Sequence, residues 1–273
     1  MQELLNHPAV QAGVAPFLAA LIAAKLFQRI GYSGLAIIAG FLITVYMVSG
    51  FAIEPLTAPR KIILLGMLSA LLGLLPLHRL VKLIPLSMLL PALGGAAAIW
   101  TVQRILRQQT LPEMLLWGAA CAAYVAVLVW GMGKLAHDPP RAAAAATALG
   151  IGTGGAALVG ASALLGQFSL ALGAAAAAHW LIQILTNRTL STGHVFTLPT
   201  AVIAGTVGCV AVLSASLPWY ALAILAGIPI VARQVSQRAK SIRQQTPLPA
   251  LATFAVAGAA IYVTWRVAGD VPF

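Results

Sequence analysis

Charged residues are the scarcest class in this sequence, making up only 8% of its 273 positions. Soluble domains carry roughly 25% charged residues and about 45–50% apolar ones, whereas 61% of this chain is hydrophobic. A water-soluble fold of this length could not cover its surface with so few charges. The composition excludes an ordinary soluble domain and predicts an all-α, polytopic transmembrane helix bundle solvated by lipid.

Acidic residues are especially rare, with five in the whole chain. Four of them fall at termini or in predicted connections, and Glu113 falls at a predicted helix start. Ionisable groups inside the bilayer are costly and usually functional. A carboxylate-free membrane interior argues against an ion pump or a proton-coupled carrier. We also predict no catalytic residues, no metal and no cofactor, and a lipid-modifying enzyme has little support because no acid–base pair is visible.

Cysteine is almost absent, and the two present, Cys121 and Cys209, lie inside apolar runs. Neither has a second cysteine or a histidine at a metal-ligand spacing. Buried thiols are therefore predicted in place of a disulfide framework or a metal site.

Basic residues are the one charged type present in number, and they give the chain a formal net charge of +11. They stand singly or in pairs between apolar runs, which argues against nucleic acid and for the lipid bilayer as the partner. Eleven of the 16 Lys and Arg residues fall in the odd-numbered connections and five on the opposite side. Because basic loops stay in the cytoplasm, we predict a multi-pass protein of a bacterial inner membrane with both termini outside the cytoplasm.

A helix needs roughly 20 apolar residues to cross the hydrocarbon core, and the sequence predicts ten such spans. The third is short and the second contains several glycines, so nine spans is the alternative. Thr110-Leu-Pro-Glu113 marks one start, because it fits a capping box with proline in the first turn. The predicted spans are 9–27, 31–50, 61–77, 83–102, 111–133, 142–164, 167–186, 197–215, 217–235 and 248–267.

The connections are short, so residues 1–273 are predicted to form a single integral membrane domain. Ten spans divide into five plus five, in residues 1–135 and 136–273. An odd number of spans per half places the halves in opposite orientations, which predicts two inverted five-helix repeats. No convincing sequence self-similarity accompanies this symmetry.

The fourth and ninth spans carry helix-breaking residues at corresponding positions of the two halves. The fourth contains Pro91-Ala-Leu-Gly94-Gly95, and the ninth contains Gly227-Ile-Pro229. Paired breaks of this kind point to the binding site of a transporter, because an interrupted helix exposes backbone groups at mid-membrane. Discontinuous helices around Pro91 and Pro229 are therefore predicted, and ordinary proline kinks are the alternative.

One polar stripe crosses the seventh span. His179, Gln183, Thr186 and Asn187 follow at offsets that place them on one helical face. They could line a solute path, or they could make interhelical hydrogen bonds worth roughly 0.6 to 2 kcal/mol each. Arg104 and Arg107, three residues apart, could contact an anion, or they could be a solvated helix end.

Small residues crowd the sixth span. Gly150 and Gly154 are spaced by four, as are Ala156 and Gly160. This spacing lets two helix backbones approach closely, so we predict a tightly packed helix pair. A sliding surface for a moving helix is the alternative.

Residues 26–34, Leu26-Phe-Gln-Arg-Ile-Gly-Tyr-Ser-Gly34, run into Ala39-Gly40. This segment loosely resembles the first spans of bacterial cation/proton antiporters. The resemblance implies an inverted-repeat carrier architecture only, because the aspartates that bind the ion in those carriers have no counterpart here.

Two functions follow as hypotheses. The first is a permease-like transporter that passes a small neutral or weakly anionic solute between two five-helix halves. The alternative is a non-catalytic scaffold or assembly subunit that binds other membrane subunits of a larger complex. Buried polar groups are scarce and the sixth span offers a packing face, and both features favour that alternative.

Overall fold

The computed structural model of this chain describes residues 7–51, 54–75, 86–160, 162–215, 217–235, 242 and 247–268. All regular structure in these residues is helical, which confirms the predicted fold class. A π-helical turn, η1 (Val10–Val14), precedes the first α-helix, and a 3₁₀ turn, η2 (Ser33–Leu35), precedes the second. The α-helices are α2 (Ala15–Gln28), α3 (Ala36–Val48), α4 (Ala58–Leu74), α6 (Leu86–Leu106), α7 (Leu111–Lys134), α8 (Pro139–Val159), α9 (Ala163–Thr186), α10 (Gly193–Ser214), α11 (Trp219–Gln234) and α13 (Pro247–Ala268).

Each of the ten predicted spans coincides with one described helix. Seven of these helices are long and apolar enough to cross a membrane, and the segments Ser33–Val48 and Trp219–Gln234 are shorter apolar helices. The chain is thus compatible with a multi-pass membrane protein, and the number of crossings stays a prediction. The capping box at the start of α7 is confirmed, because the Glu113 carboxylate accepts from the Thr110 hydroxyl at 2.7 Å and from its amide at 3.3 Å.

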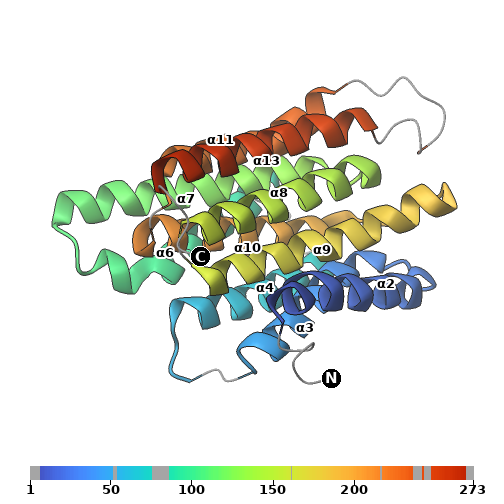
Figure 1. The fold of residues 1–273 in the computed structure, drawn as a ribbon, viewed down its shortest axis with the longest axis horizontal. Helices are drawn as coiled ribbons and strands as arrows, with labels where there is room; N and C mark the ends of the chain where they lie inside the picture. Colours follow the sequence, from blue (N-terminus) through green and yellow to red (C-terminus); the bar gives the residue numbers. More distant parts are fainter. Residues whose placement is uncertain are drawn as a thin grey trace.

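Successive helices run in alternating directions along one common axis (Figure 1). The connections before α3, after α7 and after α9 meet at one end of the bundle, where α11 also ends. Three hydrogen bonds join them there: Ser33–Ser191 (2.8 Å), Ala136–Thr192 (2.9 Å) and Arg141–Val235 (2.6 Å). This is the end that the distribution of basic residues predicts to be cytoplasmic.

The opposite end is joined in the same manner. Thr44, near the end of α3, donates to the carbonyl of Gln11 in η1 at 2.5 Å. Lys61, at the start of α4, donates to the carbonyl of Trp100 in the second half of α6 at 2.7 Å. At each end of the bundle, the first residues of one helix therefore lie beside the last residues of another, as expected for an up-and-down bundle.

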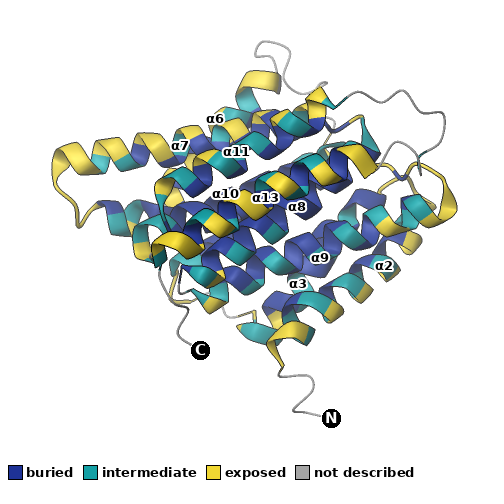
Figure 2. Cartoon of the chain, turned by 45° about the horizontal axis from the view of Figure 1, so that its top comes forward, coloured by how far each residue is buried: buried dark blue, intermediate teal, exposed yellow. Residues whose placement is uncertain are grey.

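Helix α10 forms the centre of the bundle. It packs against α4, α6, α7 and α8, and nearly all of its residues are buried (Figure 2). Helices α2 and α3 pack on α9, while α11 and α13 pack on α8. The two halves of the sequence are therefore interlocked, and an inverted-repeat relation between them stays a prediction.

The outer helices expose large apolar side chains. In α2, for example, Leu18, Ile22 and Leu26 follow one another at every fourth residue and are all exposed. An apolar outer surface of this kind is typical of a protein whose solvent is lipid. The interior is apolar as well, and most buried threonines satisfy their hydroxyls by donating to a carbonyl one turn back, as Thr200 does to Phe196 at 2.7 Å.

Glycines allow α8 and α9 to pack backbone to backbone. A Cβ atom built on Gly150 would lie 2.5 Å from the Cα of Gly173, and one built on Gly154 would lie 2.7 Å from the amide nitrogen of Leu170. The close packing predicted from the spacing of Gly150 and Gly154 is confirmed.

Candidate functional site

The two proline-containing helices are continuous. Helix α6 runs through Pro91 and α11 runs through Pro229, so the prediction of discontinuous helices is wrong. A proline removes only one helical hydrogen bond, and packing on a neighbour supports the turn around it. The Pro229 ring rests against Gly131 of α7, where an added Cβ would lie 2.8 Å from the Cγ of that ring.

The glycines near these prolines serve different purposes. A Cβ on Gly94 would lie 2.8 Å from a methyl group of Val129, and one on Gly95 would lie 3.2 Å from the carbonyl oxygen of Ala122. Gly94 and Gly95 therefore allow α6 to pack closely on α7. Gly227 of α11 has more room, since its nearest neighbour would be Val256 at 4.0 Å.

His179 and Gln183 form a buried polar pair within α9. Both are 0% exposed, and the Gln183 amide nitrogen lies 3.1 Å from His179 Nδ1. The His179 ring also packs on Phe196 with 4.8 Å between centroids. Among the described residues, neither His179 Nε2 nor Gln183 Oε1 has a partner in hydrogen-bonding geometry. The backbone of Ser191 is the polar group that lies close to the His179 ring.

Thr186 and Asn187, the other two residues of the predicted stripe, are exposed where α9 ends. The Thr186 hydroxyl donates to the carbonyl of Ile182 at 2.7 Å. Asn187 adopts the left-handed conformation (φ 49°) that commonly terminates helices. The structure therefore brings together only His179 and Gln183, and a solute path along the stripe stays a prediction.

Arg104 and Arg107 are exposed near the end of α6. Both arginines are close enough to the ammonium group of Lys61 to repel its positive charge. That ammonium group lies 5.0 Å from the centre of the Trp100 ring. Arg107 lines a cavity of about 460 Å³ between α6 and α7. Contact between this arginine pair and an anion stays a prediction.

A basic pocket lies at the other end of α6, where the connections after α7 and after α9 meet. We use this name for the cavity of about 260 Å³ lined by Ser87, Leu90, Pro91, Val129, Trp130, Gly133, Lys134, His137 and His194. The His137 and His194 rings are 6.4 Å apart and nearly perpendicular. Lys134 and Arg233 both approach the Trp130 ring, at 6.0 and 5.6 Å from its centre.

No acidic side chain is among the described residues that line the basic pocket. The carboxylate that follows Lys134 most closely in the sequence is that of Asp138. It lies 3.2 Å from the Arg141 guanidinium, and the two form the only ion pair in the described part of the chain. Lys134 thus faces the pocket with an uncompensated charge, and the two imidazoles add hydrogen-bonding groups. This arrangement suits a small anion.

The basic pocket was missed by the sequence-based prediction. The sequence shows that Lys134 and His137 follow one span and that His194 precedes another, near two different connections. Only the fold shows that these connections are neighbours, through the hydrogen bond from Thr192 to Ala136. A histidine in each of two odd-numbered connections was the available signal.

The sequence matches no protein-family model and shows no significant match to any curated protein. The resemblance of residues 26–40 to cation/proton antiporters therefore gains no support from these comparisons. Any function must be inferred from the fold and from the basic pocket.

Proposed function

We propose that this chain is a permease-like membrane protein that takes a small, weakly anionic solute into the basic pocket. The proposal includes ten membrane crossings, with the pocket at the cytoplasmic end and both termini on the opposite side. The observation that supports it is the meeting of Lys134, His137 and His194 around one cavity, with no carboxylate among the lining residues that the structure describes.

Each residue of the pocket can contribute a different interaction to binding. Lys134 supplies a fixed positive charge, and a hydrogen bond between charged partners contributes roughly 1.5–3 kcal/mol. His137 and His194 offer ring nitrogens that donate or accept according to their tautomer. Trp130 supplies an apolar wall, and its ring restrains the ammonium group of Lys134.

Pro91 retains a role in this proposal without interrupting its helix. Because proline has no amide proton, the carbonyl of the residue four positions earlier loses its usual helical partner. That residue is Ser87, which lines the basic pocket together with Pro91. The Ser87 hydroxyl can donate to an anion, whereas this carbonyl can only accept, for example from a water or from a hydroxyl of the solute.

The scaffold hypothesis has less support from the fold. It was motivated in part by the small-residue face of α8, a surface that could have received a partner protein. Gly150 and Gly154 instead pack against α9, and Gly152 packs against Ala257 of α13. This face is used within the chain.

Uptake into proteoliposomes tests the proposal. The panel contains small monocarboxylates, phosphate esters and uncharged solutes of similar size, and the proteins are wild type, Lys134→Gln and His194→Gln. Removal of one charge-assisted hydrogen bond should weaken apparent affinity for the transported anion about tenfold or more. The control is Lys25→Gln, because Lys25 is exposed in the last turn of α2 and lies outside the pocket.

Uptake of an anion by the wild type and the Lys25 variant, with weaker uptake by the Lys134 variant, would support the proposal. Absence of uptake across the panel, or equal uptake by all variants, would overturn it.

A further inference from the structure

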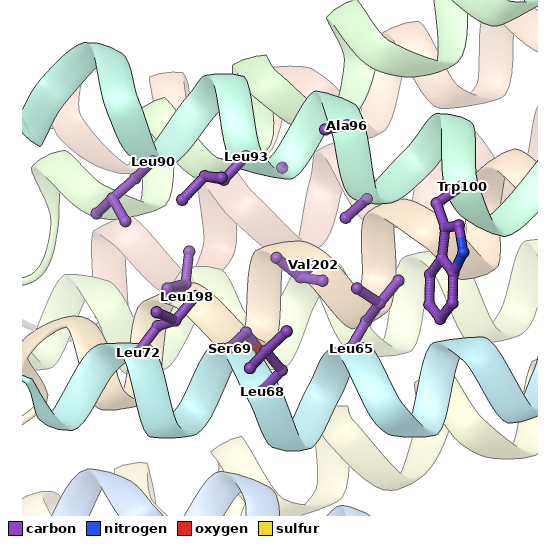
Figure 3. Close-up of a pocket in the computed structure, with 12 residues that line it drawn as sticks. Leu65, Leu68, Ser69, Leu72, Leu90, Leu93, Ala96, Trp100, Leu198 and Val202 are labelled. Atoms are coloured by element: carbon purple, nitrogen blue, oxygen red, sulfur yellow. The ribbon is translucent and has the colours of Figure 1, made fainter. Parts of the chain in front are cut away.

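An apolar groove adjoins the basic pocket. It has a volume of about 280 Å³ and lies between α4 and α6, with α10 as its floor (Figure 3). Its walls are made by leucines and small residues, including Leu68 and Leu72 of α4, Leu93 of α6 and Leu198 of α10. The one hydroxyl in the lining, that of Ser69, already donates to the carbonyl of Gly66 at 2.8 Å.

The groove is open towards the surroundings of the bundle. Helices α4 and α6 make only sparse contacts with each other, although both pack on α10. Leu68 and Leu93, from opposite walls, are 52% and 44% exposed. If the bundle is embedded in a membrane, acyl chains can enter this groove laterally between the two helices.

The length of the groove matches one leaflet of a bilayer. Along α6 it extends from Leu90 to Trp100, which is about 15 Å at the α-helical rise of ~1.5 Å per residue. The hydrocarbon core of a bilayer is ~30 Å thick. One acyl chain that starts at the membrane interface would therefore fill the groove.

Leu90 lines both the groove and the basic pocket. The apolar groove and the cavity that contains Lys134, His137 and His194 are therefore neighbours, with Leu90 between them. A molecule with an anionic head and one long apolar tail would place each part in a matching environment. Its apolar tail matches the groove by van der Waals packing, which is what holds apolar surfaces together inside a bilayer, and its negative charge favours Lys134.

We infer that the ligand of this site is an anionic phospholipid of the surrounding bilayer, with its phosphate in the basic pocket and one acyl chain along the α4–α6 groove. This inference rests on the proposed function, because it assigns the ligand class of the same pocket. It extends that function from a small anion to an amphiphile that enters from the side.

Tryptophan quenching by brominated lipids tests the inference. The full chain contains six tryptophans, and a variant that keeps only Trp100, with phenylalanine at the other five positions, reports on the groove. Phenylalanine is chosen because it keeps an aromatic ring beside Lys134 in place of the pocket residue Trp130. It is placed in vesicles of phosphatidylglycerol or phosphatidylcholine whose acyl chains carry bromine. One lysine charge should give about a fivefold preference for the anionic lipid, seen as stronger quenching at equal mole fraction.

Two changes in this reporter identify the two halves of the site. Lys134→Gln should remove the preference for phosphatidylglycerol, and Ala96→Phe should reduce quenching by filling the groove that Ala96 lines. The matched controls are Lys25→Gln and Ala259→Phe, at exposed positions of α2 and α13 outside this site.

Circular dichroism and size-exclusion elution must match the parent protein before quenching is compared. If the single-tryptophan protein fails these checks, lipids retained by the otherwise unmodified variants are quantified by mass spectrometry.

The outcomes separate this inference from the proposed function. Selective quenching of Trp100 that depends on Lys134 and is reduced by Ala96→Phe supports the lipid site, whether or not uptake of small anions is found. Equal quenching by both lipids, or unchanged quenching in the Ala96 variant, overturns the lipid site. In that case uptake of small anions that depends on Lys134 would leave the proposed function intact. Equal retention of both lipids in the mass-spectrometric measurement would overturn the lipid site in the same way.

Discussion

The contact between α8 and α9 makes a sharp prediction for the variant Gly150→Ala. A Cβ at this position would lie 2.5 Å from the Cα of Gly173, closer still to its amide nitrogen, and 2.9 Å from the carbonyl oxygen of Ser169. These are backbone atoms of the facing helix, which cannot rotate away as a side chain can. The variant can therefore fold only if α8 and α9 move apart along their contact.

The expected loss of stability combines two opposing effects. Overpacking of a tight interior costs typically 1–3 kcal/mol, and obstruction by backbone atoms favours the upper value of ~3 kcal/mol. Alanine gains up to ~1 kcal/mol over glycine in helix propensity. The net destabilisation is about 2 kcal/mol, roughly a 30-fold change in the ratio of folded to unfolded protein.

Gly258→Ala provides the matched control. Gly258 is exposed within α13, and a Cβ there would meet nothing within 4 Å. This variant gains helix propensity without a clash, so the two variants should differ by about 3 kcal/mol. Reversible unfolding by dodecyl sulfate in mixed micelles, followed by far-ultraviolet circular dichroism, measures the difference. Equal stability of the two variants would refute the packing of α8 on α9 described above.

Four further predictions can be checked independently. Thr110→Ala removes the cap of α7 and should lower stability by about 1 kcal/mol in the same unfolding assay, and an unchanged midpoint would contradict the cap. His179→Ala and Gln183→Ala should impair uptake more than expression, and a parallel loss of both would mean that the buried pair is only structural. Cys121 and Cys209, at 3% and 0% exposure, should react with maleimide only after denaturation, and fast labelling of the folded protein would disprove their burial. Reporter fusions should place both termini outside the cytoplasm, and cytoplasmic activity of either fusion would reverse the proposed orientation.

Helix positions could be predicted from the sequence because they depend on local properties. Apolar runs of sufficient length and the capping residues Thr110 and Glu113 located the helices to within a few residues. The spacing of Gly150 and Gly154 likewise predicted a close helix contact, since small residues one turn apart lie on the same face. The partner helix, α9, could not be identified in this way.

The prediction of broken helices failed because local sequence does not determine whether a proline interrupts its helix. Pro229 is accommodated by Gly131, which lies almost a hundred residues earlier in the chain and leaves room for its ring. The loss of one backbone hydrogen bond is small compared with the packing that holds the whole turn in place.

The sequence by itself determined that this chain is helical and compatible with a membrane, because hydropathy and helical periodicity are properties of each segment alone. The tertiary structure decided that α10 lies at the centre, that Lys134, His137 and His194 share one cavity, and that this cavity adjoins a groove between α4 and α6. Those arrangements depend on which helices and connections become neighbours. Contacts between distant segments settle that choice, and no single stretch of sequence records it.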